Sequence, residues 1–386
     1  MAGGDRISDW AACGVVPLTG HQDGPPLIPP GHAATRAREL AEYLGLDVDG
    51  AALLAERAAF TGRRRNGPVS VGGSCRLLPT ADGWAAVSCA RPDDPALLAA
   101  LIGRELDGDV WPAVAEWLRA HPGAELAERS TLLGAAATSV ASAKPCAAVH
   151  GFADATRFLG APRSPDGLLV VDFSALWAGP LCAHLLGLAG ARVVKVETPD
   201  RPDGARRGTA EFYRLLHAGH RSVVADPTEP DGRRFLHALV AAADVVIEGS
   251  RPRALAAWGL SPAATDATWI SITAAGRSCN RIGFGDDVAA GAGLVALDPD
   301  RAGPVFVGDA IADPLAGLTA AAAALGALPG SLVEVSMHDV VAATLDVAEP
   351  SLVARSGLAM PRAREPHGAA PNSGADTAAV RRELRC

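Results

Sequence analysis

The stretch VVDFSALWAGPLCAHLLGLAGARVVKVETPDRPDGARR (170–207) joins two apolar runs through a loop and a segment of helical length. The runs LLVVDF (168–173) and RVVKVE (192–197) are short and rich in valine, which is typical of buried parallel strands. Pro180 fits the first turn of a helix, where its missing N–H is not needed, and Gly190 fits the end of that helix. The stretch therefore predicts a strand–helix–strand unit.

The same alternation continues toward the C-terminus. Further strands are expected at 220–226, 244–249, 268–273 and 332–337. Helices are expected between them, starting with one that Thr228 can cap and continuing with 251–259, a stretch from Asp286 and a stretch from about Asp313. Strands that alternate with helices predict an α/β fold, with a Rossmann-like parallel sheet covered on both faces.

The first 165 residues have a different pattern, richer in loops and isolated helices. CRLLPTADGWAAVSCA (75–90) predicts a hairpin, because two apolar runs flank Thr-Ala-Asp-Gly and Asp-Gly suits a tight turn. Helices are expected at 94–105 and 110–120. We interpret this part as a smaller α+β domain placed N-terminally. Residues 355–376 are rich in Pro, Gly, Arg and Ala, which predicts an extended tail.

Composition narrows the function classes. The chain of 386 residues has a formal net charge of −8, which argues against a general nucleic-acid binder. Its seven scattered cysteines form no CxxC pair, which indicates reduced thiols and a cytoplasmic location. We expect no signal peptide and no membrane span. The histidines form no HxxxH or HExxH pattern, and no GxGxxG follows Asp172, so neither a metal site nor a nicotinamide site is expected.

The opening stretch resembles the signature of the CaiB/BaiF family of class III CoA-transferases: strand, Ala-Gly-Pro, helix, Gly-Ala, a strand ending Lys-Val-Glu, then an arginine. Further blocks are similar to the family in the same order, and they are FYRLLHAGHRSVVAD (212–226), DVVIEGSRP (244–252), LAAWGL (255–260), IADPLAGL (311–318) and GSLVEVSMHD (330–339). The resemblance covers about 168–346. It implies an enzyme that acts on acyl-CoA thioesters, with coenzyme A as a substrate and no permanently bound cofactor.

The order of the remaining parts departs from the family, in which a small domain follows the large one. Here the part that resembles the small domain, ADGWAAVSCARPDD (81–94) and the helices after it, comes first. In addition, DWAACGVVPLTGHQDGPPLIPPG (9–31) resembles a degraded copy of DDVAAGAGLVALDPDRAGPVFVG (286–308). Aligning Pro25 with Pro304 puts Ala34 where Asp313 lies. We therefore divide the chain into a remnant of a first copy (1–60), the small domain (61–150), the large domain (165–346) and a tail (347–386).

The resemblance implies that Asp313 is the catalytic residue. A carboxylate can attack a thioester to form a mixed anhydride, and the released thiolate can attack back to form an enzyme thioester. Asp313 precedes Pro314, which suits a helix N-cap followed by the first helical position. Asp309 is the nearest competitor if the register slips.

For coenzyme A binding, the family positions map to Trp177, Ala178, Arg206 or Arg207, and Arg251. Arginine suits phosphate because it donates in a bidentate manner. Two departures weaken the expected site: Leu176 stands where the family usually has a basic residue, and Gly249–Ser250 stand where it usually has Asn and an aromatic residue.

Two alternatives to CoA transfer stay open. The racemase branch of the family uses a histidine before its aspartate, but Asp286 stands at that position, which argues against α-methylacyl-CoA racemisation. A catalytically degenerate subunit that keeps the fold is the second. We expect a homodimer in which residues 70–145 cover the Asp313 site, more readily that of the other chain, without true interlocking.

Overall fold

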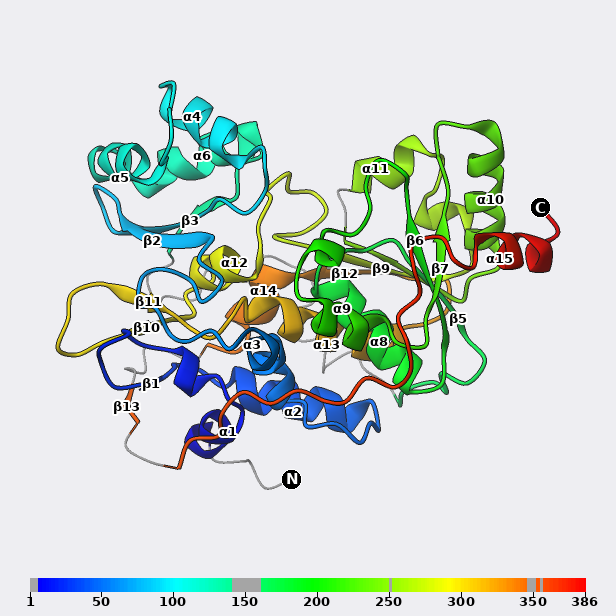
Figure 1. Ribbon diagram of the computed structural model, residues 1–386, viewed down its shortest axis with the longest axis horizontal. Coiled ribbons are helices and arrows are strands. Elements are labelled where there is room, and N and C mark those ends of the chain that lie inside the picture. Colours follow the sequence, from blue (N-terminus) through cyan, green and yellow to red (C-terminus); the bar gives the residue numbers. More distant parts are fainter. Residues whose placement is uncertain (1–5, 141–160, 250–251, 346–351, 355–356) are drawn as a thin grey trace.

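Six strands form the central sheet of the computed structural model, which describes residues 6–140, 161–249, 252–345, 352–354 and 357–386 (Figure 1). The strands lie in the order β12-β9-β8-β5-β6-β7, and every neighbouring pair is parallel. Their bounds are β5 Leu169–Asp172, β6 Arg192–Glu197, β7 Arg221–Val224, β8 Val245–Glu248, β9 Thr268–Thr273 and β12 Leu332–Ser336. The predicted α/β fold with a parallel sheet is confirmed.

Helices cover both faces because successive strand residues point to opposite sides. Val170 packs on one side, in the core that contains α8 (Ala178–Leu188) and α13 (Ala312–Gly326). Val171 packs on the other, against α10 (Pro230–Ala241). Chain order reverses at β5, whose neighbours are β6 and β8. In open parallel sheets ligands bind beyond the carboxyl ends of the strands at such a reversal, so the loops after β5 and β8 flank the expected site.

Two helix starts differ from the sequence-based expectation. Helix α8 begins at Ala178, so Pro180 is its third residue rather than its first. Helix α10 begins at Pro230 after Glu229, whereas Thr228 donates its N–H and its hydroxyl to the Asp226 side chain. The Asp226–Thr228 turn competes with helix capping for the same hydroxyl. Neither shift moves a helix to another face of the sheet.

The N-terminal half contains a second, smaller core. The predicted hairpin forms from β2 (Cys75–Pro79) and β3 (Trp84–Ser88), and β4 (Ala137–Ser139) extends it. Helices α4 (Asp94–Ile102), α5 (Trp111–Ala120) and α6 (Gly123–Leu133) pack on this sheet. We did not predict α6 or β4. In Figure 1 this unit stands apart from the large sheet and meets it near α12 (Gly285–Gly291).

Two helix pairs repeat at one sequence offset. Helix α1 (Arg6–Ala12) begins and ends 279 positions before α12. Helix α2 (Ala33–Tyr43) likewise begins 279 positions before α13. The residues with positive φ before α2 and α13, Gly31 at 71° and Ala310 at 48°, keep the same offset. This is also the offset that aligns Pro25 with Pro304. Helices α2 and α13 pack against each other.

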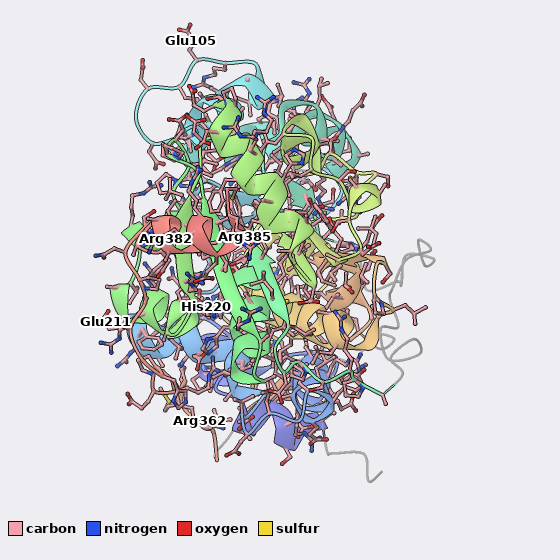
Figure 2. The ribbon with its side chains drawn as sticks, turned by 90° about the vertical axis from the view of Figure 1, so that its right-hand side faces the viewer. Glu105, Glu211, His220, Arg362, Arg382 and Arg385 are labelled. Atoms are coloured by element: carbon pink, nitrogen blue, oxygen red, sulfur yellow. The ribbon has the colours of Figure 1, made fainter. Side chains whose placement is uncertain are left out.

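The C-terminal tail crosses the molecule as a strap (357–386), extended up to α15 (Thr377–Leu384) as the composition predicted. It starts beside α1 and α2 and ends beside β7 and α10, and Figure 2 shows Arg362 near one end and Arg382 near the other. Arg364 forms a bidentate ion pair with Glu56, and Asp376 accepts a hydrogen bond from the N–H of Ser222. The strap therefore ties the N-terminal helices to the large sheet. Within the described ranges, none of the helices combines the length and apolarity that a membrane span requires.

Candidate active site

Asp313 lies in the first turn of α13, three residues after a strained residue. The helix begins at Ala312 with Ile311 as its N-cap, so Asp313 is the second helical residue and not the N-cap that we expected. The N–H of Asp313 donates to the carbonyl of Ala310, whose φ of 48° is uncommon for a residue with a side chain. Asp313 therefore lies two positions further into the helix than expected, still at the positive end of the helix dipole.

The carboxyl groups of Asp313 and Asp286 share a poorly solvated environment. Asp313 is partly exposed, whereas Asp286, on α12, is buried and accepts a hydrogen bond from the N–H of Ala310 at 2.8 Å. Burial raises the pKa of Asp313 to about 7, and it raises the pKa of Asp286 to about 7, where neighbouring Asp309 adds to the effect. The N–H of Gly285 donates to Asp313 and favours its ionised form.

Arg57 is the cation of this acidic cluster. Its guanidinium, on α3 (Glu56–Thr61), donates to both oxygens of Asp309 at 2.8 and 2.5 Å. Asp309 is fully buried, and 26% of the Arg57 side chain is exposed. The guanidinium carbon lies 4.6 Å from the centroid of the Trp177 ring. Arg57 thus contacts the segments before both α13 and α8.

Trp177 and Ala178, which the resemblance assigns to coenzyme A binding, lie at the start of α8. Both are buried, and Trp177 is the N-cap. Leu176 has a φ of 71° and is 44% exposed, so the loop after β5 is strained like the turn before α13. Strained non-glycine residues occur at sites where the surrounding structure enforces them. Trp177 contacts Arg57, which pairs with Asp309 and acts electrostatically on Asp313, so the start of α8 belongs to the surroundings of Asp313.

The small N-terminal core closes over α12 from within the same chain. The Ser88 hydroxyl, at the end of β3, donates to Asp287 at 2.7 Å, and the N–H of Phe284 donates to the same oxygen at 2.9 Å. Burial raises the pKa of Asp287 to about 6 despite these donors. The segment that we expected to cover the site, more readily that of a partner chain, thus reaches the site of its own chain.

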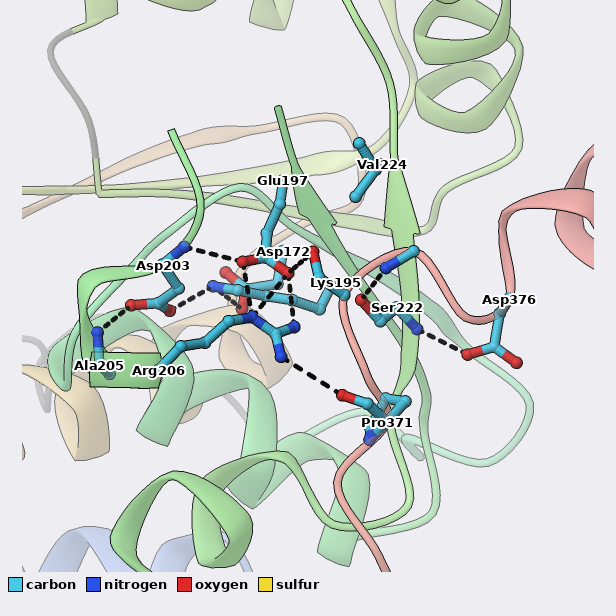
Figure 3. A network of polar contacts seen from close by, with 12 residues as sticks. Asp172, Lys195, Glu197, Asp203, Ala205, Arg206, Ser222, Val224, Pro371 and Asp376 are labelled. Carbon is cyan, nitrogen blue, oxygen red and sulfur yellow. Dashed lines mark hydrogen bonds and ion pairs between the residues drawn. The ribbon is translucent and has the colours of Figure 1, made fainter. Parts of the chain in front are cut away.

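A second polar network anchors the loop after β5 (Figure 3). The Lys195 ammonium is buried between Asp172 at 3.3 Å and Asp203 at 3.0 Å. Asp203 in turn accepts from the N–H of Leu176 at 3.0 Å. Since a buried ammonium is stable only when paired, Lys195 fixes both carboxylates and, through Asp203, the strained loop.

Arg206 belongs to this network and not to an open groove. It donates to both oxygens of Glu197, the shortest contact being 2.5 Å, and lies over the Tyr213 ring. It also donates to the carbonyl of Pro371 on the strap, as Figure 3 shows. Neighbouring Arg207 is exposed, while Arg251 and Ser250 lie outside the described residues.

Sequence reasoning missed two residues that touch the cluster, Arg57 and Ser88. Arg57 is 252 positions from Asp309 and belongs to no motif that we identified. Ser88 lies in the predicted hairpin, but it is 199 positions from Asp287, and the hairpin pattern gives it no role at the site. Asp286 and Asp309 were noted, but not their burial. No local signal in the sequence reveals these pairings.

Comparison with known proteins assigns the family. The profile of CoA-transferase family III matches residues 166–377, which is more than half of the chain. This chain belongs to CoA-transferase family III. The matched region contains the sheet, Asp313 and much of the strap, whereas Arg57 and Ser88 lie outside it.

Curated relatives match in the same region. A succinyl-CoA–D-citramalate CoA-transferase of Chloroflexus aurantiacus is 31% identical over 213 residues, which are 49% of this chain and 53% of the relative. A succinate–glutarate CoA-transferase of Agrobacterium fabrum is 28% identical over 47% of this chain and 52% of its own length. The crystal structure of a CaiB/BaiF family protein from Brucella suis is 29% identical, with a TM-score of 0.44 over 47% of this chain and 55% of that one. The chain spans about half the length of the curated relatives that it matches.

Gly285 has no room for a side chain. A Cβ atom there would lie 2.4 Å from an Asp313 carboxylate oxygen and 2.4 Å from the carbonyl oxygen of Ala310. We predict that Gly285→Ala displaces Asp313, lowers the free energy of unfolding by about 1–3 kcal/mol and abolishes activity. Urea denaturation and a transferase assay measure both effects. Gly83→Ala, in an exposed turn with space for a methyl group, is the control; full activity of Gly285→Ala would contradict the placement of Asp313.

Proposed function

We propose that this chain transfers coenzyme A from an acyl-CoA to a free carboxylic acid, with Asp313 as the nucleophile. The observation that carries the proposal is the partly exposed Asp313 carboxylate at the start of α13, in the family register, beside the start of α8. The names of the relatives make short dicarboxylic acids the first substrates to test.

The chemistry proceeds in balanced steps. A carboxylate oxygen of Asp313 attacks the thioester carbon, the thiolate of coenzyme A leaves, and a mixed anhydride forms. The thiolate then attacks the Asp313 acyl carbon, which releases the donor acid and leaves an aspartyl-CoA thioester. The acceptor carboxylate attacks this thioester and expels the thiolate. The thiolate finally attacks the acceptor's acyl carbon of the new anhydride, which restores Asp313.

Two alternatives predict different behaviour. Racemisation requires a second base open to substrate, but Asp286 is buried and one of its oxygens holds the N–H of Ala310. A degenerate subunit would bind no coenzyme A, which isothermal titration measures directly. The transferase proposal includes binding of the acyl-CoA by Trp177, Ala178, Arg207 and Arg251. It also includes a cytoplasmic location.

We also propose that residues 1–60 are the remnant of a first family copy, followed by a small domain (61–150), a large domain (165–346) and a tail (347–386). The constant offset of 279 positions between α1–α2 and α12–α13, including the residues with positive φ, supports a duplication. At this offset Ala34 occupies the place of Asp313, and it is fully buried. Each chain would then keep one nucleophile.

Asp313→Asn tests the nucleophile. The amide keeps the shape of the side chain but cannot attack a thioester, so we expect activity to vanish while coenzyme A binding and thermal stability persist. Because burial raises the pKa of Asp313 to about 7, wild-type kcat/KM should rise with pH up to about that value as the carboxylate forms. Mass spectrometry should detect the covalent adduct in the wild type alone. Asp300→Asn, at an exposed position, is the control; residual activity above about a tenth would contradict the assignment.

The adjacent arginines should separate binding from stability. Arg206→Ala leaves buried Glu197 without its ion pair, so we expect a loss of about 3 kcal/mol in the free energy of unfolding. Arg207→Ala should change that free energy by less than about 0.5 kcal/mol but raise the KM for the acyl-CoA, because its exposed guanidinium is free to approach the phosphates. Urea denaturation and initial rates measure the two quantities, and an unchanged KM in Arg207→Ala would remove this residue from the proposed binding set.

We propose a homodimer, because family members act as dimers and the N-terminal part has rearranged relative to the family. The contact of Ser88 with Asp287 means that the site is covered within one chain, so dimerisation is not required for that cover. Light scattering of dilute protein should give about twice the chain mass of 39.3 kDa. A mass near that of one chain, with full activity, would rule the dimer out.

A further inference from the structure

The guanidinium of Arg57 lies at the Asp313 site but comes from the segment outside the matched family region. We propose that Arg57 is a positioning residue of the Asp313 site: it clamps the turn before α13 to the start of α8 and balances the acidic cluster around the nucleophile. This inference rests on the proposed function for its catalytic meaning, but its physical content can be measured without any activity.

The geometry of the clamp comes first. The bidentate pair with Asp309 holds the residue directly before Ala310, whose positive φ sets where α13 begins. A bidentate pair fixes direction as well as distance, since both N–H···O bonds must align. The guanidinium carbon also lies over the ring of Trp177, which is the N-cap of α8. One planar group therefore joins the starts of the two helices that flank the site.

Lysine could not replace these contacts. An ammonium is a point charge on a flexible stem, so it cannot donate in parallel to both Asp309 oxygens while lying flat on an indole. Arg57 is itself held, because Glu56, its neighbour on α3, pairs with Arg364 of the strap. The Glu56–Arg364 pair thus connects α3, which carries Arg57, to the C-terminal strap.

The charges around Asp313 come from several packed elements. Asp286 and Asp287 lie on α12, Asp309 lies in the turn before α13, Arg57 lies on α3, and Arg281, before α12, acts on Asp287. Burial is the largest cause of the raised pKa of Asp313; Arg57 opposes it, and Asp287 and Asp309 add to it. Arg57 and Asp309, the two partners of the ion pair, therefore shift the pKa of Asp313 in opposite directions.

This opposition gives a sharp test. Arg57→Gln should raise the pKa of Asp313 and Asp309→Asn should lower it, because the two variants remove charges of opposite sign near the carboxyl group. The double variant should return toward the wild type. If the ion pair merely supported the fold, both single variants would loosen the site in the same way and would shift the pKa in the same direction.

Infrared difference titration of the protonated-carboxyl band measures this pKa directly, with Asp313→Asn in each background to isolate its contribution. The matched control is Arg362→Gln, which removes a surface ion pair with Asp49 from the same N-terminal helices; it should leave the titration unchanged. Shifts in the same direction, or no shift in either single variant, would overturn the proposal. Because the readout needs no substrate, failure of the transferase assay would count against the proposed function alone.

Kinetics then connect the clamp to the reaction. The apparent pKa on the acid side of the kcat/KM profile should follow the infrared titration. It should rise in Arg57→Gln and fall in Asp309→Asn. Arg57→Lys keeps the charge but loses the clamp, so it should keep the wild-type limb and lower kcat by about tenfold or more. An unchanged kcat in Arg57→Lys would overturn the clamp. Arg57→Gln leaves Asp309 buried without a partner and risks misfolding. The double variant Arg57→Gln/Asp309→Asn avoids that unpaired charge. Far-UV circular dichroism of both variants shows whether each one folds.

Discussion

The close packing of α8 on α13 is the constraint from which the site follows. Helix α13 is built largely from alanine and is almost entirely buried. A Cβ atom on Gly317 would lie 2.7 Å from the carbonyl oxygen of Ala178, so only glycine lets the two backbones approach this closely. This approach brings the starts of both helices together near the carboxyl end of β5. Their positive ends, the strained residues Leu176 and Ala310, and the Asp313 carboxylate thus meet in one place.

Placing carboxyl groups here costs stability at neutral pH. Each of Asp286, Asp287 and Asp313 has a folded-state pKa above its ordinary value, so the folded protein holds these protons more tightly than the unfolded chain. Stability from these groups is therefore full at low pH and declines as pH rises from about 4 toward 7. Arg57 offsets part of this cost, because its positive charge favours the ionised forms of Asp286 and Asp313. The Lys195 network holds the neighbouring loop after β5. The chemistry and the destabilisation have the same source, which is a carboxylate with little water around it.

Local patterns in the sequence were enough to predict the sheet, the order of its helices and the hairpin of the small core. These elements depend on residues close together in the chain, such as the valines of β5 and β6 or the Asp-Gly turn at 82–83. The position of Asp313 followed from the register of the family blocks. The roles of Arg57, Ser88 and Arg206 could not be predicted, because each depends on a partner or a packing surface that only the folded chain supplies. Arg206 is instructive, since its partner Glu197 is only nine residues away, yet an exposed arginine fits the same sequence equally well.

The strap has a consequence for how the molecule is made. Arg57 leaves the ribosome 252 residues before Asp309, on the order of 10–50 s earlier at common rates of synthesis. Glu56 waits longer still for its partner, because Arg364 follows it by 308 residues. The acidic cluster and Arg57 can therefore meet only after Asp309 has emerged, and the Glu56–Arg364 pair beside Arg57 can form only later. A nascent chain of this protein thus carries Arg57 well before the acidic cluster that it pairs with, so the surroundings of Asp313 can be completed only late in synthesis.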